Sequence, residues 1–242
     1  MIIAILISVH LLADFLFQTS AYSEKKRKKL KPLLLHCFIY FIVFEILLLP
    51  ILQFKKAFLL GMIISVLHFL INFIKNKLEK SFPQRRLQIW IFSINQLIHF
   101  ALLIGMNYIF NLENSVSNLY IKLQGYENFK TIILYISVFS IIFEPASLFI
   151  RKLFTSISSK TYPKTNLEEL KAGNIIGKLE RIIIAILLLN NQFGVIGFVL
   201  TAKSIARFKQ MENRDFAEKY LIGTLTSFLI VLISVFILKG LL

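Results

Sequence analysis

Apolar residues run along this chain in long blocks separated by short polar and basic segments. A block of about 20 apolar residues is long enough for a helix to cross the hydrocarbon core of a bilayer. Blocks of this kind lie at residues 2–19, 33–50, 57–74, 88–110, 130–150, 177–192 and 218–238. A shorter block, 194–208, contains Lys203 and Arg207 and is an eighth span if its charged ends reach the lipid surface. The pattern predicts an all-α, polytopic membrane helix bundle with seven or eight spans.

The composition agrees with this pattern. Of the 242 residues, 57% are hydrophobic and 24 are phenylalanine, and the mean hydropathy is +0.72. The single cysteine, Cys37, excludes an internal disulfide and a cysteine-based zinc site. No polar segment is long enough to fold alone, so we expect one membrane domain over residues 1–242. It divides into a His-containing half, 1–110, and a C-terminal helical half, 130–242.

The basic residues lie almost entirely on one side of the predicted bundle. The formal net charge is +15, and the exceptions among the 28 Lys and Arg residues are Lys55, Lys56, Lys122, Lys130 and Lys239. Because basic loops stay in the cytoplasm, the N-terminus is expected outside and the large basic loops inside. We therefore expect a multi-pass protein of the inner (cytoplasmic) membrane that contacts the lipid bilayer and its anionic headgroups. The run EKKRKKLK lacks interleaved aromatic residues, so nucleic acid is not an expected partner.

Polar side chains interrupt the first four blocks at matching depths. In the stretch VHLLADFLFQT, His10, Asp14 and Gln18 recur every fourth residue and share one helix face. All four histidines lie in these blocks, each within about 16 Å of the expected cytoplasmic end at about 1.5 Å per residue. Four antiparallel helices can bring these groups into one cavity open to the cytosol. The residues expected to line it are His10, Asp14, Gln18, His36, His68, Asn72, Gln96 and His99.

Such polar groups point to a metal site. A central Asp costs roughly 2.5–3.5 kcal/mol within a span, so we expect it to be paired or functional. Imidazoles with a carboxylate suit a divalent metal ion such as zinc or manganese. The expected metal ligands are His10, Asp14, His68 and His99. Asp14 and His36 are the expected catalytic residues, with His36 moving protons at the cytosolic mouth. The alternative is a hydrogen-bonded network that joins helices without an ion.

The later blocks carry a second set of charged residues near their cytoplasmic ends. Glu180 and Arg181 lie in GNIIGKLERIII, and Lys203 and Arg207 lie in the short block. One interpretation is a pocket that binds an anionic headgroup or phosphate. The binding residues expected for it are Lys75, Glu180, Lys203 and Arg207. The alternative is that Glu180 and Arg181 form an ion pair or anchor the bundle at the lipid surface.

Two further acids lie within the blocks. Glu45 is in the middle of the second block, and Glu144 precedes Pro145 in the fifth. A proline at that place predicts a kink that frees backbone carbonyls.

Several stretches together resemble an uncharacterised family of bacterial integral membrane proteins, the domain-of-unknown-function family 3307. They are HLLADFLFQT, HFLINFIK, NQLIH, GNIIGKLERIII and AKSIARF…FAEKYLIGTL. The resemblance covers nearly the whole chain. In that family the third-span motif looks like His-x-x-x-Asp and the fourth like Asp-Gln-x-x-His, whereas this chain has Asn72 and Asn95 at the Asp positions. Asp14 is then the remaining carboxylate of the implied site. The resemblance implies no activity, because the family has no settled function.

Three functions fit these observations. The first is a metal-dependent membrane hydrolase or transferase that acts on a lipid-like substrate. The second is a transporter or channel in which the polar residues form an ion or proton path. The third is a regulatory or effector component whose basic loops dock a cytosolic protein partner, or which acts as a homo-oligomer.

Overall fold

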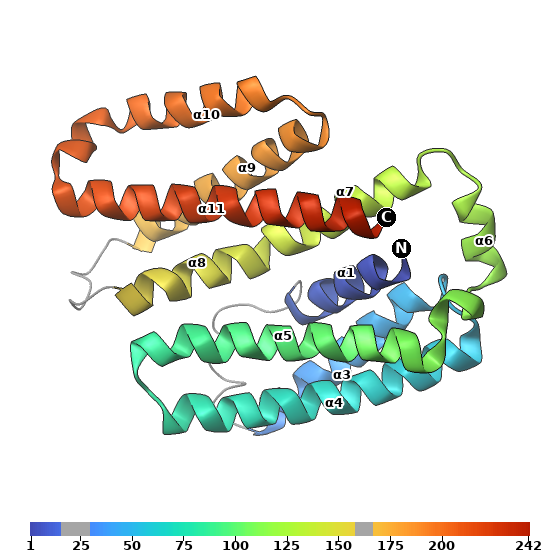
Figure 1. Cartoon of the computed structure of the whole chain (residues 1–242). Helices are drawn as coiled ribbons and strands as arrows, with labels where there is room; N and C mark the ends of the chain where they lie inside the picture. Colours follow the sequence, from blue (N-terminus) through green and yellow to red (C-terminus); the bar gives the residue numbers. More distant parts are fainter. Residues whose placement is uncertain (16–29, 158–166) are drawn as a thin grey trace. The chain divides into compact units, whose positions relative to one another are not determined.

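The computed structural model describes residues 1–15, 30–157 and 167–242. Within these ranges the structure is helical, and its one β-type pairing is an isolated antiparallel bridge between Leu52 and Val116. The chain forms two compact units, residues 1–140 with 241–242 and residues 141–240. The boundary between the units falls inside the fifth predicted block, after the segment that separates the predicted halves. Figure 1 labels the helices.

Four helices form the core of the first unit. They are α1 (Ile2–Phe15), α3 (Leu30–Leu48), α4 (Phe54–Ser81) and α5 (Arg85–Phe110). Helix α1 packs on α3 and α5, and α4 packs on the same two helices, so the four helices close into a ring. Its interior is filled by buried apolar side chains such as Leu6, Phe44, Leu60, Ile64 and Leu103. Helices in lipid associate by close packing of this kind, because the acyl chains outside are equally apolar.

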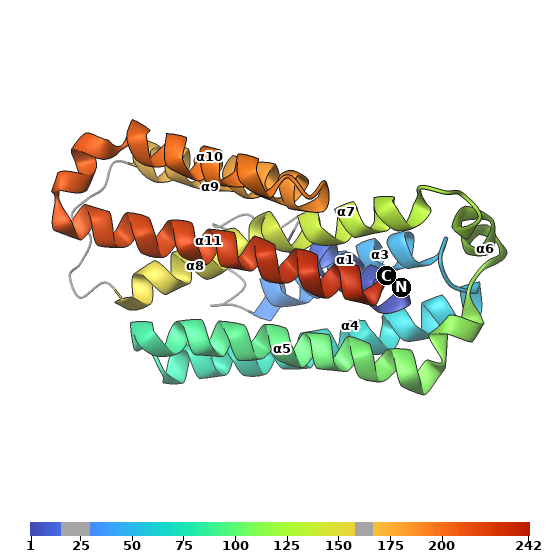
Figure 2. The ribbon, with the colours of Figure 1, turned by 45° about the horizontal axis from the view of Figure 1, so that its top comes forward.

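The ends of α4 and α5 follow from single residues. Pro83 disfavours helical geometry in the residue before it, and α4 ends at Ser81. Helix α5 begins at Arg85 and returns beside α4, as both Figure 1 and Figure 2 show. At its other end, Asn111 adopts the left-handed conformation, with φ at 47°, and ends the helix.

The segment between α5 and α7 is folded. It contains η1 (Leu112–Ser115) and α6 (Asn118–Gln124). Tyr120 of α6 is buried in the core of the first unit. The backbone N–H of Gln53 donates to the carbonyl of Ser115 at 2.9 Å, which ties this segment to the α3–α4 connection. The predicted outer loop is therefore an ordered part of the first unit.

A helix break divides the fifth predicted block. Helix α7 (Phe129–Ile142) ends, and α8 (Glu144–Ile157) begins after Phe143. Pro145 is the second residue of α8, where a missing N–H is tolerated because the first turn has no intrahelical acceptor for it. The proline marks a change from one helix to the next, where the sequence predicted a kink.

The second unit contains α8, α9 (Leu167–Leu189), α10 (Phe193–Ala206), η2 (Phe208–Glu212) and α11 (Arg214–Leu241). Helix α9 packs on both α8 and α10. A tight turn joins α9 to α10, and Asn191 accommodates it with a positive φ of 58°. The short predicted block is thus a separate helix.

Five helical segments among the described residues are long and apolar enough to cross a membrane. They are α3, α4, α5, the stretch Phe129–Ile157 that contains α7 and α8, and α11. The all-α prediction is confirmed, but the predicted count of seven or eight spans is not. Helices α1 and α10 are apolar, yet each has only 14 described residues. Helix α9 begins with LEELK and includes Lys178, Glu180 and Arg181, which lower its hydropathy.

Candidate metal centre

Each helix of the ring places one histidine in the interior of the first unit. His10 comes from α1, His36 from α3, His68 from α4 and His99 from α5. Their exposed fractions are 1%, 5%, 0% and 1%. The ring of helices therefore gathers imidazoles that are far apart in the sequence into one buried cluster.

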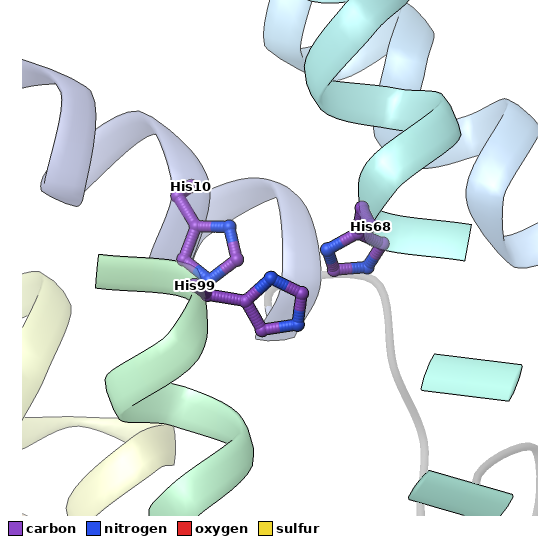
Figure 3. Close-up of side chains that lie close together, drawn as sticks. All are labelled: His10, His68 and His99. Carbon is purple, nitrogen blue, oxygen red and sulfur yellow. The ribbon is translucent and has the colours of Figure 1, made fainter. Parts of the chain in front are cut away.

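The first group of this cluster consists of His10, His68 and His99. One ring nitrogen of each lies within 4.8 Å of the others. The centroid of the His99 ring is 4.9 Å from that of His10 and 4.6 Å from that of His68, and Figure 3 shows the three rings together. Nε2 of His10 and Nδ1 of His68 are buried without a hydrogen-bond partner among the described residues. Such an unsatisfied buried atom costs about 1–3 kcal/mol, which a bound cation would offset.

The second group consists of Asp14, His36 and His68, all buried. Nε2 of His36 lies 3.0 Å from Oδ1 of Asp14. Nε2 of His68 lies 3.7 Å from the same oxygen and 3.4 Å from Nε2 of His36. From the sequence, Asp14 was expected to bind a metal together with His10, His68 and His99, whereas its closest imidazole in this group is that of His36. His68 belongs to both groups.

Tyr40 supports both groups, and the sequence analysis missed it. Its hydroxyl lies 2.9 Å from Nδ1 of His10. Its ring stacks on His68, with centroids 3.9 Å apart and planes 9° apart. Metal-binding histidines usually make a hydrogen bond through their other ring nitrogen, which fixes the tautomer and the ring orientation. Tyr40 could have been identified from the sequence, because it lies four residues after His36 and therefore on the same face of α3.

One amide lies directly against the cluster. Asn72 is 2% exposed, and its Nδ2 is 2.8 Å from Nε2 of His68. Further along α4, the ammonium of Lys75 lies 5.9 Å from the centroid of the Phe92 ring. Of the cations predicted to bind a headgroup, Lys75 is the one that belongs to the first unit.

A second buried amide, Asn95, was not among the residues expected to line the cavity. Asn95 lies one turn before His99 on α5, is 4% exposed, and has no hydrogen-bond partner for its side chain among the described residues. Gln96, which was expected to line the cavity, is only partly buried. The i, i+4 spacing that links His10 to Asp14 also links Asn95 to His99 and could have identified it. Gln18 lies outside the described residues.

In the second unit, two of the residues predicted to bind a headgroup form an ion pair. Nζ of Lys203 lies 2.6 Å from Oε2 of Glu180 and donates to Oγ1 of Thr224 at 2.8 Å. Arg207 is partly buried and donates to Oε1 of Gln210 at 3.1 Å. The charge of Lys203 is thus already compensated by a carboxylate within the same unit.

Arg181 forms hydrogen bonds at the break between α7 and α8 and does not pair with its neighbour Glu180. Its Nε donates to the carbonyl of Ile142 at 2.6 Å. Its guanidinium also donates to Oγ of Ser147 at 2.5 Å and to Oγ of Ser227 at 3.3 Å. Arg181 is only 3% exposed. A buried cation therefore satisfies a carbonyl at the point where α7 ends.

Comparison with known proteins matches this chain to a family. The model of the family described as "Protein of unknown function (DUF3307)" matches residues 2–125, just over half of the chain. The chain belongs to the DUF3307 family. The DUF3307 match contains all four histidines and Asp14, and it ends at α6. The later stretches included in the resemblance lie beyond it. No curated protein and no solved structure matches the chain.

Proposed function

We propose that this protein is a metal-dependent membrane hydrolase or transferase that acts on a lipid-like substrate. The observation that carries the proposal is the buried convergence of His10, His68 and His99, whose donor nitrogens come within 4.8 Å of one another from three helices. Imidazole donors suit zinc, and a nearby carboxylate also admits manganese. The expected cofactor is therefore one of these divalent ions.

The surrounding residues have distinct roles in this proposal. A bound divalent ion polarises a substrate oxygen or makes a nucleophile of bound water at neutral pH. Tyr40 holds the ring of His10 through Nδ1, which leaves Nε2 for the ion. Asp14 receives a proton from the nucleophile, and His36, at 3.0 Å from its carboxylate, moves that proton toward solvent.

The proposed substrate class follows from the site's location. The cluster lies inside a ring that includes three helices of membrane length, so an amphiphile from the lipid phase is the natural substrate. Because the Lys and Arg residues are concentrated in loops on one side, we expect the N-terminus outside and the large loops in the cytoplasm of an inner membrane. Lys75 lies two helical turns, or about 10 Å, beyond His68. It is placed to attract an anionic headgroup, and Glu180, Lys203 and Arg207 remain a separate candidate headgroup site in the second unit.

Metal analysis of the purified full chain tests the proposal. After loading with zinc or manganese in detergent and removal of free ion, elemental analysis should find at least one ion per chain. His10→Ala and His99→Ala should each lower this content, whereas Ser65→Ala, a buried change one turn from His68, should not. The loaded protein should release a product from phosphatidylethanolamine and phosphatidylglycerol vesicles, detected by mass spectrometry. A monodisperse wild-type chain that retains no ion would overturn the proposal.

A transporter or channel is the second candidate, and one observation favours it. Glu45 and Ser65 are buried, and their side-chain oxygens have no hydrogen-bond partner among the described residues. Ser65 lies one turn from His68 on α4, and the carboxylate of Glu45 occupies the space where a Cβ of Gly61 would stand. Polar positions thus continue along α3 and α4 away from the histidines.

Flux measurements distinguish this candidate from the enzyme. Proteoliposomes containing a pH-sensitive dye should show proton movement that Glu45→Gln removes, if the polar residues form a path. Glu113→Gln, in η1, is the matched control because Glu113 is exposed. Absence of flux, together with vesicle hydrolysis that Glu45→Gln leaves intact, would reject transport and retain the enzyme.

A further inference from the structure

We propose that the centre holds two divalent cations and that His68 bridges them. This inference rests on the proposed function, because it adds a second ion to the same centre. The first ion binds His10, His99 and one nitrogen of His68. The second binds Asp14, His36 and the other nitrogen of His68. With one ion bound, Asp14 and His36 carry protons as proposed above, and when the second ion is bound they hold it instead.

The donor atoms of the second group already have the spacing of ligands around one ion. The distances among Oδ1 of Asp14, Nε2 of His36 and Nε2 of His68 are 3.0, 3.4 and 3.7 Å. Around a tetrahedral zinc ion with bonds of about 2.0–2.1 Å, neighbouring ligand atoms are about 3.3 Å apart. The observed distances lie on both sides of that value, so an ion fits with small side-chain adjustments.

Nε2 of His68 has two polar neighbours in this group. Nδ2 of Asn72 lies 2.8 Å from Nε2 of His68, and because an amide N–H donates, that ring nitrogen accepts. The same nitrogen lies 3.7 Å from Oδ1 of Asp14, which also accepts. A cation between this nitrogen and Oδ1 of Asp14 would take the place of the hydrogen bond from Asn72 and bind both atoms. A half-turn of the Asn72 amide would present its oxygen instead and supply a fourth ligand.

His68 has a second nitrogen for the first group. Its Nδ1 is buried without a hydrogen-bond partner among the described residues. Figure 3 shows one ring nitrogen of His68 turned toward the side where His10 and His99 lie. The stacked ring of Tyr40 fixes the plane of the His68 imidazole, so the two nitrogens remain directed at different groups. One imidazole can therefore serve both ions.

The bridge has a defined proton balance. Neutral His68 carries one ring proton, and binding of ions at both nitrogens releases that proton to solvent and leaves a bridging imidazolate. No electron is transferred. Given bonds of about 2.0–2.1 Å on each side of the ring, the two ions lie about 6 Å apart. The carboxylate of Asp14 and the imidazolate together offset part of their charge.

Metal stoichiometry tests the second ion separately from the first. We expect two zinc ions per wild-type chain in detergent, one in His36→Ala, one in His99→Ala, and two in the Ser65→Ala control. If His36→Ala does not remain monodisperse, Asp14→Asn tests the same group with a smaller change. One ion in both the wild type and the His36 variant would overturn the second site and leave the proposed function standing. No ion in any variant would overturn both.

Copper substitution tests the bridge itself. Two cupric ions joined by an imidazolate couple magnetically, so the wild-type electron paramagnetic resonance signal should be well below that expected for its copper content. His36→Ala should give the full signal of one isolated ion. Two ions with uncoupled signals in the wild type would overturn the bridging role of His68.

Discussion

The two units differ in how they bury most of their polar side chains, although Oε1 of Glu180 in the second unit also lacks a hydrogen-bond partner among the described residues. In the second unit, Lys203 is paired with Glu180, and Arg181 is hydrogen-bonded to a backbone carbonyl and two serine hydroxyls. In the first unit, His10 and His68 have buried nitrogens without hydrogen-bond partners among the described residues, while their donor atoms converge. Satisfied polar groups hold helices together, whereas convergent nitrogens without hydrogen-bond partners could bind an added ligand. Under the proposed function, the chemistry therefore lies in the first unit and the second unit provides structural support.

The largest expected effect comes from His68→Ala, which removes a ligand from both groups. Bound zinc and vesicle hydrolysis should both fall to background, because neither group keeps three donors. Elemental analysis and product detection on the same preparation measure this. Metal content that survives in His68→Ala would reverse the assignment of chemistry to the first unit.

Arg181→Met should affect stability without affecting metal. The change removes a buried cation and its hydrogen bonds to the Ile142 carbonyl and to the hydroxyls of Ser147 and Ser227, at a cost of about 2–4 kcal/mol in the free energy of unfolding. Unfolding in detergent, followed by circular dichroism, measures the loss, and Arg181→Lys should retain part of the stability. Lost metal in a folded Arg181→Met chain would show that the units are not functionally separate.

Tyr40→Phe should weaken metal binding and preserve the fold. It removes the hydroxyl next to Nδ1 of His10, and loss of such an outer partner typically costs 10–100-fold in metal affinity. Competition with a chelator measures the affinity. Tyr120→Phe is the matched control, since Tyr120 is also buried in the first unit but lies in α6. Equal effects of both variants would mean that Tyr40 acts only through packing.

Asn72→Asp should strengthen metal binding, whereas Tyr40→Phe should weaken it, and the change in affinity should be smaller. A carboxylate beside Nε2 of His68 adds an anionic ligand, and we expect roughly tenfold tighter zinc binding, or about 1.4 kcal/mol. The same chelator competition measures it. Weaker binding in Asn72→Asp would argue that the amide stabilises the neutral ring and that no second ion is present.

The smallest expected effect concerns the ion pair of the second unit. A double-mutant cycle with Lys203→Met and Glu180→Gln should give a coupling free energy of about 1 kcal/mol. The exposed pair of Arg214 and Glu218 is the control and should couple less. If Lys203→Met instead abolishes binding to phosphatidylglycerol vesicles without altering stability, a headgroup site would replace the structural role.

Most helices could be predicted from the pattern of apolar blocks, because length and hydropathy depend only on local sequence. The four histidines of the cluster could also be predicted, since the depth of each along its helix follows from residue counting. The contacts between members of the cluster could not be predicted. Asp14 was assigned with His10 because the i, i+4 spacing puts them on one face, but its carboxylate reaches His36 on α3. That spacing does not fix rotamers or contacts across helices.

Arg181 shows the same limit in the second unit. Its proximity to Glu180 suggested an ion pair, yet adjacent residues on a helix point in different directions. In the structure, the guanidinium of Arg181 donates to the carbonyl of Ile142, which has no intrahelical partner because α7 ends at this residue. Pro145 predicted that the helix would be disrupted, but it did not predict which side chain would donate to the carbonyl left free there.

By itself, the sequence determined that this protein is helical, that several of its helices can span a membrane, and which polar residues interrupt them. Those properties depend on hydropathy, periodicity and length within single segments. Only the tertiary structure decided that His68 belongs to both groups of candidate metal ligands, that Tyr40 stacks on its ring, and that Arg181 donates to the carbonyl left free at the helix break. These depend on how helices are rotated and packed against each other, which is set by side-chain contacts between distant parts of the chain.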